Sequence, residues 1–156
     1  MDIKKILLGT ALSVSIMMGT AFADNNAVKV LIDGQNVEFT DQIPIIIEGR
    51  TLVPIRAVME ALGKQVAWDS ENNMVIVSDE YITLKLGIDS NVMKNEITDP
   101  VTGEVFEFDT ELDVAPVVIN DRTCLPIRAV VEGFGISVTW DEETNSVLIL
   151  SDSLLC

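Results

Sequence analysis

Four arginines are the side chains in this sequence best suited to bind a charged group: Arg50, Arg56, Arg122 and Arg128. Arg56 and Arg128 each fall in the first turn of a predicted helix, where the helix dipole disfavours a cation. One interpretation is a site for an anion or a carboxylate ligand. The other is an internal ion pair, which we favour because Glu60 and Glu132 lie four residues further on.

Side chains that perform catalysis are scarce. The chain contains no histidine, which excludes Ser-His and Cys-His pairs. A zinc ion would have only two distant cysteines and carboxylates as ligands. A carboxylate pair for glycoside cleavage stays open, because acids are abundant. We therefore expect no catalytic residue, metal or cofactor, with a glycan-degrading enzyme as the remote alternative.

Two tryptophans have the chemistry to stack on sugar rings. Strand alternation places Trp68 and Trp140 on the same face as a valine two residues earlier, which predicts that both indoles lie in the core. Phe106 and Phe108 in "EVFEF" share a face opposite Glu107. We expect these two rings to be core side chains as well.

An acidic stretch offers candidates for a calcium site: Asp99, Glu104, Glu107 and Asp109. It lacks the ordered D-x-[DN]-x-[DN]-G loop, and strand alternation would spread the acids apart. We favour a solvated strand edge, where such charges oppose mispairing.

The two cysteines are Cys124 and Cys156. A disulfide between them is permissible if the protein is exported, but spacing alone cannot establish its geometry. Cys124 matches the apolar Leu52 of an internal repeat, so a buried thiol is the other interpretation.

The internal repeat is the clearest pattern in the chain. "GRTLVPIRAVMEALG" begins at Gly49 and "DRTCLPIRAVVEGFG" begins at Asp121, and the copies align without gaps over 43–78 and 115–150. The markers of the repeat are Pro54, Gly63, Trp68 and Asp69, matched by Pro126, Gly135, Trp140 and Asp141. So many identities at one offset indicate an internal duplication.

Each copy predicts the same elements around these markers. Proline suits the first turn of a helix and glycine suits the residue just past its end, with one apolar stripe between them. Strands, helix and hairpin then follow one another in each half. We expect an α+β domain in which a twisted antiparallel sheet packs on two short helices.

The first residues have the layout of a secretory signal. Lys4 and Lys5 precede an apolar run, and Ala21-Phe22-Ala23 ends it, so residues 1–23 are predicted to be a cleaved signal peptide. The domain is then 24–156, with pseudo-repeats of about 28–78 and 99–151 joined by 79–98. We expect no membrane association after cleavage.

The formal net charge of −15 makes free nucleic acid a poor partner, because its phosphates would be repelled. A cell-wall polymer or an envelope protein is a possible partner.

The paired "PIRAV" helix starts, their closing glycines and the "V.WD" turns resemble the copper amine oxidase N-terminal-like domain. Such stalk domains occur on exported proteins of Gram-positive bacteria. The resemblance implies a twisted antiparallel sheet around helix, and an appendage rather than a catalytic domain. Amine oxidase chemistry needs three histidines on copper and a processed tyrosine, whereas this chain has no histidine and only Tyr81.

We therefore expect a secreted, non-catalytic domain of the cell envelope that acts by binding or as a spacer. The alternative is a structural module that self-associates or is disulfide-linked.

Overall fold

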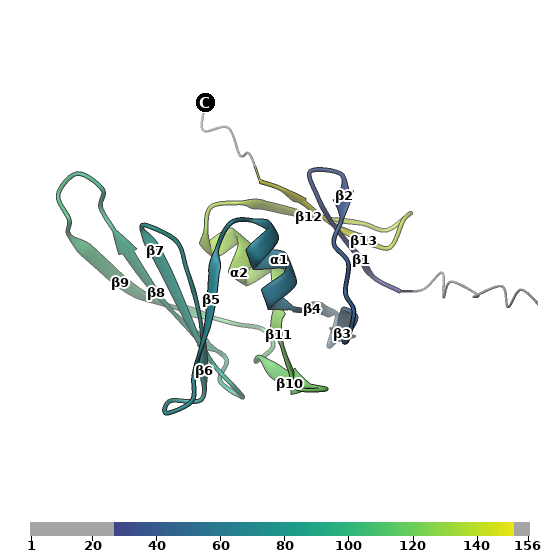
Figure 1. Cartoon of the computed structure of the whole chain (residues 1–156), viewed down its shortest axis with the longest axis horizontal. Helices are drawn as coiled ribbons and strands as arrows, with labels where there is room; N and C mark the ends of the chain where they lie inside the picture. The colour runs from purple at the N-terminus through teal and green to yellow at the C-terminus, as the bar shows by residue number, and fades with distance from the viewer. Residues whose placement is uncertain (1–26, 152–156) are drawn as a thin grey trace, which may run out of the picture.

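The computed structural model describes residues 27–151 (Figure 1). Of these residues, 50% lie in strands and 11% in helices, and the strands form three sheets beside two short helices. The expected α+β class is therefore wrong, and the domain is mostly β. The helices stay short because a glycine follows the end of each one. The segment 79–98, which joins the two pseudo-repeats, adds two long strands to the β content.

The central sheet joins the two repeats. It consists of β10 (Val117–Ile119), β11 (Arg122–Pro126), β4 (Arg50–Pro54) and β3 (Ile45–Ile47), in that order. The antiparallel middle pair places Leu125 opposite Val53, with Cys124 opposite Pro54 and Pro126 opposite Leu52. The same three pairs result when each residue is replaced by its match in the other repeat, because Leu52, Val53 and Pro54 match Cys124, Leu125 and Pro126. The repeats are therefore related by a local two-fold axis between β4 and β11.

The helices are α1 (Ile55–Ala61) and α2 (Ile127–Gly133), and each contacts the central strand of the other repeat. Pro54 and Pro126 were predicted in the first turn of each helix, but they lie one position earlier, at the N-cap. Their backbones are extended, so each proline is the last residue of a strand. Gly63 and Gly135 each have a φ of +74° just past the helix end, as predicted. Buried residues from each predicted apolar stripe face the core.

The first outer sheet is a meander of β5 (Gln65–Asp69), β6 (Met74–Ser78), β7 (Ile82–Gly87), β8 (Val92–Thr98) and β9 (Val105–Glu111). Its strand β9 forms an edge away from the helices (Figure 1). The side chains of Phe106 and Phe108 are 54% and 50% exposed. The expectation that they are core residues is wrong, because β9 has no layer packed over it.

The second outer sheet contains β12 (Ser137–Asp141), β13 (Ser146–Leu150), β1 (Lys29–Ile32) and β2 (Gln35–Asn36). Strands β1 and β2 form the hairpin predicted at Asp33-Gly34. Strand β1 pairs with β13 in parallel, which corrects the expectation of one antiparallel sheet. Strands β6 and β13 are matching strands of the two repeats. In the first outer sheet β7 pairs with β6, and in the second outer sheet β1 pairs with β13 in the corresponding position.

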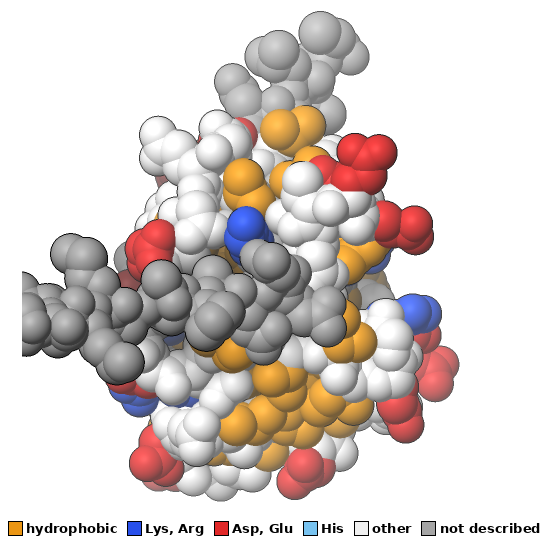
Figure 2. Space-filling model, turned by 90° about the vertical axis from the view of Figure 1, so that its right-hand side faces the viewer, with side chains coloured by type: hydrophobic (Ala, Val, Ile, Leu, Met, Phe, Trp, Pro, Cys, Tyr) orange, Lys and Arg blue, Asp and Glu red, His pale blue; other side chains and the backbone are white. Residues whose placement is uncertain are grey.

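The main core lies around the two helices and the inner faces of the outer sheets. A second, smaller cluster of Leu52, Val114 and Cys124 lies on the other face of the central sheet. Figure 2 shows hydrophobic side chains gathered on the lower part of one face, where β3 and β10 lie in Figure 1. Within residues 27–151, no helix is long and apolar enough to span a membrane.

Candidate functional site

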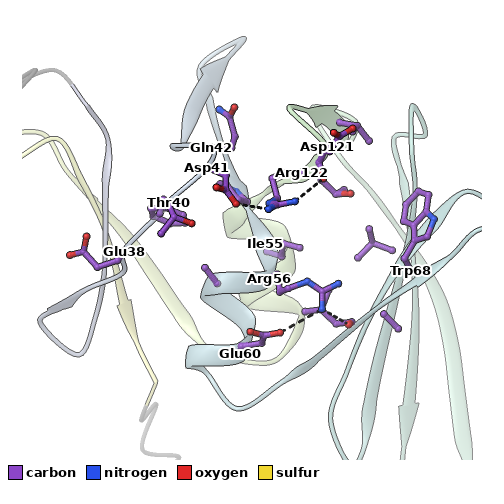
Figure 3. A pocket seen from close by; sticks show the side chains of 18 residues that line it. Glu38, Thr40, Asp41, Gln42, Ile55, Arg56, Glu60, Trp68, Asp121 and Arg122 are labelled. Carbon is purple, nitrogen blue, oxygen red and sulfur yellow. Dashed lines mark hydrogen bonds and ion pairs between the residues drawn. The ribbon is translucent and has the colours of Figure 1, made fainter.

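A groove with a volume of about 670 Å³ opens between the two repeats. Its walls are the segment 38–42, helix α1, strand β5 and the turn between β10 and β11 (Figure 3). Arg56, Trp68 and Arg122, three of the residues singled out from the sequence, line it. The groove therefore combines charged groups from both repeats with one exposed aromatic ring.

Arg122 reaches the groove from β11 and pairs with Asp41, which lies two residues before the aligned block 43–78 of the first repeat. Its Nη1 atom also donates a hydrogen bond to the carbonyl of Asp121, at 3.4 Å. The two-fold mate of this pair is the ion pair between Arg50 and Asp113, at 2.6 Å, which lies outside the groove. Each arginine thus pairs with an acid that lies two residues before the aligned block of the other repeat.

Arg56 extends from the first turn of α1 along the floor of the groove (Figure 3). Its Nη1 atom lies 3.6 Å from Oε1 of Glu60 and donates a hydrogen bond to the Val66 carbonyl at 3.4 Å. These contacts offset the unfavourable end of the helix dipole. Arg128, its mate in α2, has no ion pair with the residues that the structure describes.

The two tryptophans are not core side chains, which corrects the prediction. Trp68 is 45% exposed and Trp140 is 37% exposed. Each lies on a strand at the edge of its sheet, β5 or β12, so only one neighbouring strand flanks it. Trp68 lines the groove opposite the segment 38–42 (Figure 3), whereas Trp140 does not line it.

The charge of the groove does not favour an anion. Two arginines line it, against four acids: Glu38, Asp41, Glu60 and Asp121. Asp41 and Glu60 already compensate the arginines. The arginines therefore present fixed hydrogen-bond donors beside carboxylate acceptors, and they do not form a free cationic patch.

The matched residues Asp69 and Asp141 cap the hairpin turns. Asp69 accepts hydrogen bonds from the Asn72 side chain and from the Asn72 and Glu71 amides, and these bonds lower its pKa. The Thr144 hydroxyl does the same for Asp141 and lowers that pKa as well. Neither aspartate binds an arginine, so both are structural turn residues.

The candidate calcium ligands are not brought together. Asp99 accepts hydrogen bonds from the Thr102 and Val101 amides, which lower its pKa. Glu107 and Asp109 lie two positions apart on β9, opposite Glu96 and Lys94. Among residues 27–151, no three acidic or cysteine side chains form a group suited to a metal ion.

Cys124 is fully buried, and burial raises the pKa of its thiol. Its Sγ atom lies 3.9 Å from the Arg122 carbonyl. Among the described residues Cys124 forms no disulfide, and its side chain lies in the small cluster of the central sheet. The predicted alternative, a disulfide with Cys156, falls outside the described residues.

Sequence reasoning identified Glu60 as a partner of Arg56 but missed the other three acids of the groove. Asp41 lies just before the aligned block, and Asp113 stands at the matching position before the second copy. Extending the repeat alignment by two residues would have shown a carboxylate at both places. Asp121, from the turn before β11, has no acidic counterpart, because Gly49 occupies the matching position.

No curated protein and no solved structure matches the chain. One family model, described as the copper amine oxidase N-terminal domain, matches residues 31–149. This span covers nearly all of both repeats, from the second half of β1 to the last residue but one of β13, and it includes the whole groove. The resemblance drawn from the repeated motif is therefore confirmed. The chain belongs to the family of copper amine oxidase N-terminal domains, which is a family of non-catalytic domains.

Proposed function

We propose that this protein is an exported, non-catalytic binding module of the bacterial cell envelope. The observation that carries the proposal is the groove, which gathers Arg56, Trp68 and Arg122 at the boundary between the repeats. A concave site with a few convergent polar groups is the usual form of a ligand site. Export is supported by the pattern of residues 1–23, which lie outside the described structure.

Binding without catalysis fits the groove better than glycan cleavage does. A glycosidase needs one carboxyl group that stays protonated, usually in an apolar pocket. Asp41 and Glu60 are instead more than half exposed, and each faces an arginine. The family is also one of non-catalytic domains.

Co-sedimentation with purified Gram-positive cell walls tests this proposal. We expect residues 24–156, which include every described residue, to pellet with the walls. Binding should persist in the presence of a chelator, because the described acids form no metal site. Arg122→Ala should weaken binding about tenfold, since it removes a charge-assisted group from the groove.

Arg50→Ala is the matched control, because it breaks the two-fold mate of the same ion pair outside the groove. It should leave wall binding unchanged. Absence of wall binding by the unmodified domain would refute a wall-adhesion role. Equal losses in the two arginine variants would show that the groove is not the site.

A further inference from the structure

We propose that the groove binds a neutral carbohydrate, with Trp68 as the stacking surface and the two arginine–carboxylate pairs as hydroxyl ligands. This inference rests on the proposed function and specifies its ligand class. It follows from three features of the groove: an exposed indole, two compensated ion pairs and an excess of negative charge.

The exposed indole provides an apolar face for a sugar ring. Trp68 remains 45% exposed although it lines a concave site, so part of its ring is free to contact a ligand. Pyranose rings carry C–H groups on one face, and their partial positive charge is attracted to the negative face of the indole. Stacking of this kind does not require a charged ligand.

The ion pairs supply donors and acceptors side by side. Arg122 and Asp41 lie in contact on one side of the groove, and Arg56 and Glu60 lie on its floor (Figure 3). Neighbouring sugar hydroxyls both donate and accept hydrogen bonds. Each arginine–carboxylate pair can therefore bind one vicinal diol, with the arginine as donor and the carboxylate as acceptor. Hydrogen bonds to charged groups are about twice as strong as neutral ones.

The net charge argues against ionic ligands. Four acids and two arginines line the groove, so a phosphate or uronate polymer would be repelled. A cationic ligand would be repelled by Arg56 and Arg122, which line the same groove. A neutral polyhydroxyl ligand avoids both conflicts and uses every charged side chain of the two pairs.

The duplication provides an internal control for the experiment. Trp140 matches Trp68 in sequence but lies outside the groove. We would screen residues 24–156 on an array of neutral glycans and then titrate the best oligosaccharide by isothermal titration calorimetry, whose signal does not depend on either tryptophan. Trp68→Ala should weaken binding at least about tenfold. Trp140→Ala should change it less than about twofold, whereas Trp68→Phe should restore part of the affinity.

Ionic strength separates the ligand classes in the same assay. Affinity for the neutral glycan should stay constant between about 0.05 M and 0.5 M salt, because no net charge is paired. Circular dichroism of each variant would show that the fold is intact. Binding to none of the neutral glycans, or equal effects at Trp68 and Trp140, would overturn the inference.

Failure of the inference can be distinguished from failure of the proposed function. If the domain pellets with walls but Trp68→Ala pellets equally well, the carbohydrate inference is wrong and wall binding stands. If the domain binds neutral oligosaccharides through Trp68 but not walls, the inference stands and the wall role is wrong.

Discussion

Matched residues of the two repeats have different surroundings, and the groove depends on that difference. Arg56 has a carboxylate and a carbonyl as partners, whereas its mate Arg128 has no ion pair in the described chain. The sequence identifies the residue types that matter, because the duplication marks them twice. It does not show which copy builds the site, since that depends on the segment 38–42 and on the turn before β11.

Asp79 is a residue at which stability should depend on pH. Burial opposes its charge, but hydrogen bonds from Lys64 Nζ and from the Tyr81 and Ile82 amides outweigh burial and lower the pKa of its carboxyl below 3.8. Asp79→Asn should therefore lower the free energy of unfolding at pH 7 by about 2 kcal/mol, a typical value for hydrogen bonds to a charged group. Urea denaturation followed by circular dichroism measures this loss.

The sign of the pH dependence follows from the lowered pKa. The stabilisation by Asp79 should be fully present above the unfolded pKa near 3.8, and it should be lost as the pH falls through the lower folded pKa. The difference between Asp79→Asn and the unmodified domain should thus shrink toward zero in acid. Glu71→Gln, at an exposed acid of the neighbouring turn, serves as the control. A difference that stays constant below the folded pKa would contradict the assignment.

At the scale of elements, the close contact between α2 and β7 sets a limit on side-chain size. A Cβ atom at Gly133 would lie 2.8 Å from Cδ1 of Leu84, which is fully buried. Overpacking of this kind costs about 1–3 kcal/mol, and alanine gains at most about 1 kcal/mol of helix propensity over glycine. Gly133→Ala should therefore destabilise the domain by about 1 kcal/mol in urea denaturation.

Leu84→Val combined with Gly133→Ala tests the cause of that loss. Shortening Leu84 removes the atom that the new methyl group meets, so the double variant should be more stable than the sum of the single effects. The matching position in α1 is already an alanine, Ala61, and it is exposed. A Gly133→Ala variant as stable as the unmodified domain would show that α2 and β7 are less tightly packed.

The elements that the sequence predicts well are local. The helix between Pro54 and Gly63 and the hairpin at Asp69 depend on neighbouring residues, and both occur in the structure. The division into three sheets and the parallel pairing of β1 with β13 depend on contacts between distant segments. The tryptophans were misplaced for a related reason: alternation identifies the shared face of a strand but not its place at the edge of a sheet.

At the scale of the whole molecule, the first described strand completes the last sheet. Val28, Val30 and Ile32 are buried in the main core, and β1 lies directly beside β13. Burial of each such side chain contributes about 1.5–3 kcal/mol, whereas a whole domain is stable by only about 5–15 kcal/mol. A shortened chain, 38–156, should therefore show no cooperative unfolding transition in urea.

A peptide of residues 24–37 added in trans should restore that transition in the shortened chain, because it supplies β1 and β2. Gln35→Ala, at an exposed position of the β2 edge, should leave the full domain within about 0.5 kcal/mol of its original stability. Cooperative unfolding of 38–156 with an unchanged denaturant slope would show that β1 is dispensable. The expected loss instead makes the domain one folding unit, in which neither repeat closes its core without a strand from outside that repeat.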